Sequence, residues 1–98
     1  MAEPKVTRKF ETGDVYLTKG VDVLTKKNDK YRGEVMKSLA RYLQGDWGDL
    51  DDEDKLANEQ ALKYEERLLG RYNIEPRPIY IITEWDRSAT TILFPEEY

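Results

Sequence analysis

Apolar residues recur at helical spacing in the segment from Lys30 to Gln44. The apolar positions there are Val35, Met36, Leu39, Tyr42 and Leu43. Their return every three or four residues predicts a helix with one buried face. Gly45 follows and ends this helix, because glycine adopts the left-handed conformation at little cost.

A second helix is predicted from about Asp51 to Tyr64. Asp49 or Asp51 can accept hydrogen bonds from free backbone N–H groups as its N-cap. Ala57, Ala61 and Tyr64 share one face, where the small alanines let the helix pack close to a neighbour. The first turn holds the acids Asp52, Glu53 and Asp54, in the place where the helix dipole favours negative charge.

After this helix the apolar period becomes two, which predicts strands in RLLGRYNI, IYIITEW and ATTILF. The short turn over residues 86–89 makes the last two strands a hairpin. Apolar residues on both faces of residues 78–85 predict a central strand. An earlier strand is expected at Val15–Leu17, between Gly13 and Gly20.

The order β-α-α-β-β-β predicts one small α+β domain over residues 10–98. It has a C-terminal antiparallel meander and two helices packed on one face. Residues 1–9 are polar and contain Pro4, so we expect them to form a flexible N-terminus.

The composition limits the chemistry that this chain can perform. It has no cysteine and no histidine, which excludes disulfides and thiolate metal sites and removes the commonest general base. No glycine-rich phosphate loop is present, so no cofactor is expected. There is neither an apolar run long enough to span a membrane nor a signal-peptide pattern, and we expect a cytoplasmic protein.

Charge is segregated along the sequence. The net charge of -4 argues against broad binding to nucleic-acid phosphates. A basic segment nevertheless precedes an acidic one. The basic residues are Lys26, Lys27, Lys30, Arg32, Lys37 and Arg41, and the acidic ones are Asp46, Asp49, Asp51, Asp52, Glu53 and Asp54. Such a dipolar molecule could be steered towards a charged partner, although ordinary solvated faces give the same pattern.

The acidic stretch GDWGDLDDEDK has several interpretations. A calcium loop starting at Asp49 would place Asp54 at the position that needs glycine and Gln60 at the position that needs glutamate, so the calcium pattern fails. No metal ligands are assigned, and loose magnesium binding by the clustered carboxylates stays an alternative. An acidic mimic of DNA would need more net charge than this chain carries. Trp47 is either a core plug that closes the turn between the helices or an exposed anchor for a partner, and we favour the plug.

The stretch TEWDRSATT gathers polar groups around the hairpin turn. Glu84 or Asp86 could act as a base, Arg87 as an anion clamp and Ser88 as a nucleophile, but no histidine can activate that serine. We favour a structural role, in which Asp86 accepts turn backbone bonds and Arg87 pairs with a carboxylate. Trp85 is then a cross-strand partner of Thr90 or its neighbours.

The blocks GDWG, TEWDRSATT and PEEY resemble those of an uncharacterised family of small plasmid- and phage-borne bacterial proteins. Members often carry labels such as plasmid-related protein or type I restriction subunit. The likeness runs from about Phe10 to Tyr98, and it departs at Lys26–Gly33 and at RYLQ before Gly45. It implies carriage on a mobile element and supplies no catalytic residues. The chain also lacks the cofactor loop and the length of a methylase.

These observations lead to three hypotheses. The first is a non-enzymatic protein-protein interaction module that inhibits a host defence nuclease, as an anti-CRISPR or anti-restriction protein, by covering its basic nucleic-acid-facing surface. Its predicted partner-binding residues are Asp46, Trp47, Asp49, Asp51, Asp52, Asp86 and Arg87. The second is a regulatory module that binds nucleic acid through the basic segment. The third is a small carboxylate metal enzyme.

Overall fold

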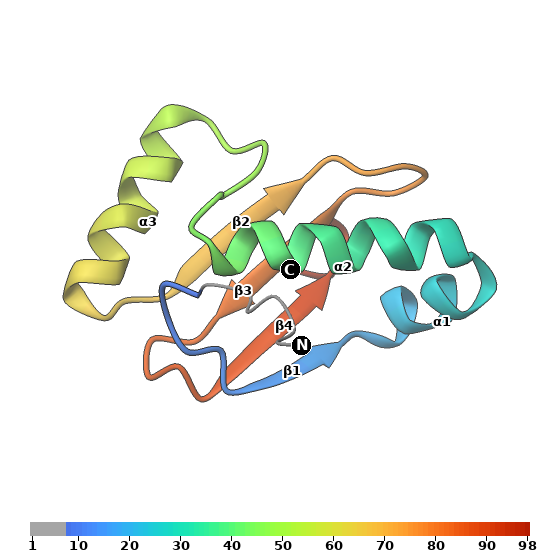
Figure 1. Ribbon diagram of the computed structural model, residues 1–98, viewed down its shortest axis with the longest axis horizontal. Helices are drawn as coiled ribbons and strands as arrows, with labels where there is room; N and C mark the ends of the chain where they lie inside the picture. The colour runs from blue at the N-terminus through green and yellow to red at the C-terminus, as the bar shows by residue number, and fades with distance from the viewer. Residues whose placement is uncertain (1–7) are drawn as a thin grey trace, which may run out of the picture.

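The structure is a computed structural model, and it describes residues 8–98. The elements run in the order β1 (Asp14–Leu17), α1 (Lys19–Lys27), α2 (Asp29–Leu43), α3 (Asp52–Tyr64), β2 (Leu68–Tyr72), β3 (Ile79–Thr83), β4 (Ala89–Leu93) and the short 3-10 turn η1 (Pro95–Glu97). The fold is α+β, as predicted (Figure 1). No helix in this part of the chain is long and apolar enough to cross a bilayer.

Four strands form one mixed sheet in the order β1-β4-β3-β2. Strands β2, β3 and β4 make the predicted antiparallel meander, and β3 lies between two neighbours, as expected of a central strand. β1 joins the far side of β4 in parallel, with Asp14 opposite Ala89. The outer edges of the sheet therefore belong to β1 and β2.

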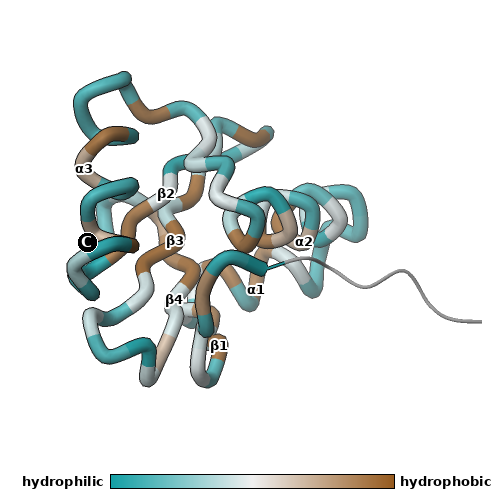
Figure 2. The backbone as a smooth tube through the Cα atoms, turned by 60° about the vertical axis from the view of Figure 1, so that its left-hand side comes forward, coloured by the Kyte–Doolittle hydropathy of each residue, from teal (hydrophilic) through white to brown (hydrophobic). Residues whose placement is uncertain are grey.

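Two helices do cover one face of the sheet, but one of them is not the expected one. The pair is α1 and α2, while α3 lies beyond β2 on the other side of the strands (Figures 1 and 2). α1 is not one of the two helices predicted from the sequence. Val21 and Thr25, one turn apart on α1, are both buried, and Thr18 caps its start by accepting the Val21 N–H.

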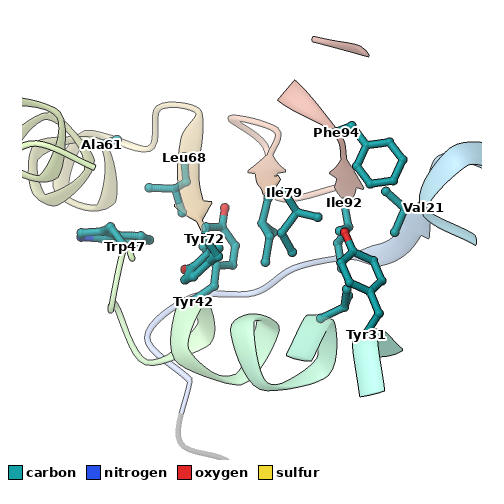
Figure 3. Packing of buried hydrophobic residues seen from close by; sticks show 12 residues of the cluster. Val21, Tyr31, Tyr42, Trp47, Ala61, Leu68, Tyr72, Ile79, Ile92 and Phe94 are labelled. Atoms are coloured by element: carbon teal, nitrogen blue, oxygen red, sulfur yellow. The ribbon is translucent and has the colours of Figure 1, made fainter. Parts of the chain in front are cut away.

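The core fills the space between α1, α2 and the sheet (Figure 3). Its large buried side chains include Val21, Tyr31, Val35, Tyr42, Leu68, Tyr72, Ile79, Ile81, Ile92 and Phe94. The buried tyrosines keep their hydroxyls bonded: Tyr31 donates to the Arg77 carbonyl at 3.0 Å and Tyr72 to the Asp46 carbonyl at 2.7 Å. Each ring is therefore buried without leaving an unpaired polar atom.

Two predicted helix ends are confirmed, the Asp51 cap of α3 and the stop at Gly45. Asn28 caps α2 by accepting the Tyr31 N–H at 3.0 Å, and Asp51 caps α3 by accepting the Asp54 N–H at 2.9 Å. Gly45 follows α2 with a φ of 81°, in the left-handed region that favours glycine.

The buried face of α3 differs from the prediction. Ala57 and Tyr64 are exposed, and the buried residues are Asn58 and Ala61. The reason is that α3 packs against an edge strand through a polar side chain. Asn58 donates its amide to the Leu69 carbonyl at 2.6 Å and accepts the Leu69 N–H at 3.1 Å.

Residues 1–7 of the predicted flexible terminus lie outside the described residues. Of the rest of that segment, Lys9 donates its backbone N–H to the Leu43 carbonyl at 2.8 Å. Ordered contacts therefore begin before Phe10, where the domain was predicted to start.

Candidate functional site

The loop between α2 and α3 covers the outer edge of β2. The Arg71 N–H donates to the Trp47 carbonyl at 3.2 Å, and the Asp49 N–H donates to the Arg71 carbonyl at 2.7 Å. The Asp49 carboxylate accepts the Asn73 N–H at 2.8 Å. Together with the Asn58 amide on Leu69, the loop pairs backbone groups that an edge strand would otherwise expose.

Gly48 is required for this close approach. Its φ is 77°, and a Cβ atom on it would lie 2.0 Å from the Arg71 carbonyl oxygen. Any side chain here would push the loop off β2. The tight glycine turn of the acidic stretch thus has a structural cause.

Asp46 is held by α2. Its carboxylate accepts the Arg41 Nε at 2.7 Å, Nη2 at 3.2 Å and the Gly48 N–H at 3.0 Å. The hydrogen bond from Arg41 lowers the pKa of the Asp46 carboxyl below its ordinary value. Asp46 is exposed, but its charge is already paired.

Trp47 is the core plug that the sequence favoured. Only 3% of its surface is exposed. Its ring stacks on Phe10 with centroids 6.0 Å apart and meets Tyr42 edge-on at 5.6 Å, while its Nε1 donates to the Glu59 carboxylate at 2.7 Å. The prediction of Trp47 as a partner-binding residue is therefore wrong, because its indole lies behind α3 and the aromatic cluster.

The hairpin residues Asp86 and Arg87 also serve the fold. The Asp86 carboxylate accepts the Ser88 N–H at 3.0 Å, and the bonding to Ser88 lowers the pKa of this carboxyl. The turn interpretation of Asp86 is confirmed.

The prediction that Arg87 pairs with a carboxylate is wrong. Its guanidinium donates to the carbonyl oxygens of Glu66 at 2.6 Å, Glu84 at 3.1 Å and Ala61 at 3.2 Å. The Ala61 carbonyl lies in the last turn of α3, and the Glu66 carbonyl lies just beyond its end, where the helix dipole favours a cation. Arg87 therefore ties the hairpin turn to the end of α3.

The predicted contact residues do not gather in one patch. Asp49, Asp51 and Asp52 lie at the start of α3, and Asp86 and Arg87 lie near its end. A helix of 13 residues separates them, a distance of roughly 20 Å at about 1.5 Å per residue. What lies between them is the outward side of α3 itself (Figure 1).

This outward side carries exposed apolar residues that the sequence analysis did not select. Leu56 is 59% exposed and Tyr64 is 64% exposed. Trp85 is 65% exposed, and its carbonyl accepts a bond from Arg87, which places its backbone beside the end of α3. We call Leu56, Tyr64 and Trp85 the α3 face.

The cross-strand interpretation of Trp85 is wrong. β3 ends at Thr83, which pairs with Thr90, so Trp85 already belongs to the turn. The signal for the α3 face was present in the sequence, because Leu56 and Tyr64 stand two spacings of four residues apart.

Negative charge surrounds the α3 face. The segment 49–66 contains eight acidic and two basic residues, a net charge of -6 in a chain whose total is -4. The exposed acids at the start of α3 are Asp51, Asp52, Glu53 and Asp54. No group of three or more acidic side chains within residues 8–98 is arranged to hold a metal ion.

The basic segment is partly neutralised. Lys26 pairs with Asp22 at 3.0 Å and Arg41 with Asp46 at 2.7 Å. Lys30 and Lys37 on α2 are exposed. A separate hollow of about 490 Å³ lies over α1, lined in part by Lys19, Lys27, Arg77 and Phe94.

Comparisons of the chain with protein-family models, with curated proteins and with solved structures give no match.

Proposed function

We propose that the protein is a non-catalytic interaction module of a mobile element. It acts in the bacterial cytoplasm by binding a host defence nuclease, a CRISPR effector or a restriction enzyme, and covering its basic nucleic-acid-facing surface. The observation that carries this proposal is the α3 face. Leu56 and Tyr64 stand exposed within the acidic segment 49–66, and Trp85 stands exposed in the hairpin turn beside the end of α3.

The chemistry of this surface fits a basic protein partner. Tryptophan and tyrosine contribute strongly to binding energy when a partner covers them. The acidic surroundings would steer a positively charged surface towards the face and orient it there. The mobile-element context comes from the family resemblance of the sequence blocks.

The test is a cleavage assay with purified CRISPR effector and restriction nucleases, with and without excess protein. We expect the wild-type chain to inhibit at least one nuclease. The double variant Leu56→Ala/Tyr64→Ala should raise the inhibitory concentration at least about tenfold, because it removes two central anchors. Met36→Ala is the matched control, since Met36 is 57% exposed on α2, away from this face.

Unaltered cleavage by every nuclease at excess protein, together with a pull-down that recovers no defence protein, would contradict the proposal. Inhibition that persists in the double variant would place the binding surface elsewhere. Salt-sensitive DNA binding that is lost on Lys30→Glu/Lys37→Glu would instead support the nucleic-acid-binding alternative.

A further inference from the structure

The two outer edges of the sheet are treated differently. β2 is covered by the α2–α3 loop and by Asn58, as described above. β1 has β4 on one side, and no element within residues 8–98 pairs with its other side. The outer side of β1, which we call the β1 edge, is thus open in the described part of the chain.

The parallel register determines which backbone groups the β1 edge presents. The Asp14 N–H donates to the Ser88 carbonyl and the Thr18 N–H to the Ile92 carbonyl. Because backbone groups alternate along a strand, Val15 and Leu17 direct their N–H and C=O groups outward. These groups form a template for an added strand.

The side chains of β1 do not protect this edge. Val15 is 44%, Tyr16 53% and Leu17 39% exposed. Natural edge strands are commonly blunted by lysine, proline or a bulge. The strand DVYL contains no lysine or proline, and its four residues pair with β4 in an unbroken register.

We propose that β1 pairs with β1 of a second copy of this chain, antiparallel across a two-fold axis, so that the two sheets become continuous. Both outward residues of the strand find an outward partner within the strand when Val15 stands opposite Leu17 of the second copy. Tyr16 then faces its own counterpart at the axis, in the closer type of antiparallel pair, where aromatic side chains contact well.

A second copy fits this edge because the strand is complementary to itself. The same register sets Asp14 opposite Thr18 of the second copy, next in sequence to the cationic Lys19, and no like charges stand opposite within the strands. Glu97 lies near Thr18, at the end of β1, and its carboxylate is already bonded. Its Oε1 accepts hydrogen bonds from the Thr18 hydroxyl and the Phe94 N–H.

The contact is small. A strand of four residues buries much less than the roughly 800 Å² per partner of a standard interface. We therefore expect a weak dimer, with a dissociation constant on the order of 100 µM.

The first test is sedimentation of the full chain from about 10 µM to about 1 mM, a range that brackets the expected dissociation constant. The mass should rise from 11.6 kDa towards twice that value. Tyr16→Lys places two ammonium groups at the axis and should raise the dissociation constant at least about tenfold. Tyr64→Lys is the matched control, an equally exposed tyrosine on α3, and should dimerise like the wild type.

The second test reports the register. The chain has no cysteine, so a single Tyr16→Cys variant can form a disulfide only between copies. Mild oxidation should cross-link Tyr16→Cys, because residues opposite at the axis have Cβ atoms roughly 4.5–5.5 Å apart. Tyr64→Cys should stay uncross-linked. A wild type that remains monomeric throughout, or equal cross-linking of the two variants, would overturn the proposal.

Discussion

At the scale of single residues, one chain of hydroxyls crosses the core. Tyr42 Oη lies 2.7 Å from Thr83 Oγ1, which lies 2.8 Å from Thr90 Oγ1, and Thr90 donates to the Thr12 carbonyl at 2.9 Å. A hydroxyl has one proton to give. Thr90 gives its proton to Thr12, so Thr83 must donate to Thr90, and Tyr42 to Thr83.

This fixed direction predicts the effect of removing one member. Thr83→Val leaves the buried Tyr42 hydroxyl without its acceptor and Thr90 without its donor. The free energy of unfolding should fall by about 1–3 kcal/mol, the usual cost of a stranded buried polar group. Urea denaturation measures the change.

Thr91→Val is the control for this prediction. Thr91 lies on the same hairpin, but it is only half-buried and faces the other side of β4. An equal loss in both variants would show that the hydroxyl chain has no special weight.

The sequence favoured burial of Trp47, but it did not show that Trp85 is exposed. Trp47 is buried because Phe10, 37 positions earlier in the chain, stacks on it, and because Tyr42 meets its edge. Trp85 is exposed because β3 ends two residues before it. Both outcomes depend on tertiary contacts and on the exact end of a strand, which local patterns do not contain.

At the scale of elements, α3 is attached to the sheet by polar contacts more than by an apolar face. Asn58 imitates a neighbouring strand by bonding both backbone groups of Leu69. Arg87 binds carbonyls at the end of the same helix. Asn58 and Arg87 therefore help to hold α3 in place, beside Glu59, which accepts the Trp47 Nε1–H.

Asn58→Ala should release α3 from β2. It removes both bonds to Leu69, and the free energy of unfolding should fall by about 1–3 kcal/mol. Hydrogen exchange of the Leu69 amide should accelerate more than that of Ile81, which lies within the sheet.

Gln60→Ala on the exposed side of α3 is the control for this substitution. Unchanged exchange at Leu69 in Asn58→Ala would mean that the asparagine does not hold the edge.

The elements with strong periodicity were predictable. α2 and α3 have clear caps, and β2, β3 and β4 follow one another through short connections. The parallel pairing of β1 with β4 joins Val15 to Thr90. No local pattern specifies a contact between positions so far apart. For the same reason the sequence did not show that α1, and not α3, covers the sheet beside α2.

At the scale of the whole molecule, three fully buried tyrosines make the stability of the fold depend on pH in the alkaline range. Burial raises the pKa of Tyr31 to about 12, and it also raises the pKa values of Tyr42 and Tyr72. The unfolded chain releases these protons near the ordinary value of 10.0. The contribution of these neutral tyrosines to the free energy of unfolding is therefore fully present below pH 10.0. It should be lost as the pH rises from there to about 12.

A titration followed by tyrosinate absorbance and circular dichroism tests this. Tyr31, Tyr42 and Tyr72 should ionise together with the loss of the helix signal. In urea, where the chain is already unfolded, these three should ionise at lower pH. Ionisation of the three with the helix signal unchanged would refute the prediction.

The double attachment of α3, by Asn58 at its middle and Arg87 at its end, also bears on how its outer surface meets other molecules. A helix clamped in this way is already rigid before an encounter, so little motional freedom is lost when its exposed side chains are covered. Asn58 and Arg87, which would not contact the bound partner, would then influence how long it stays bound. Removing either attachment would weaken binding although every exposed side chain of α3 is kept.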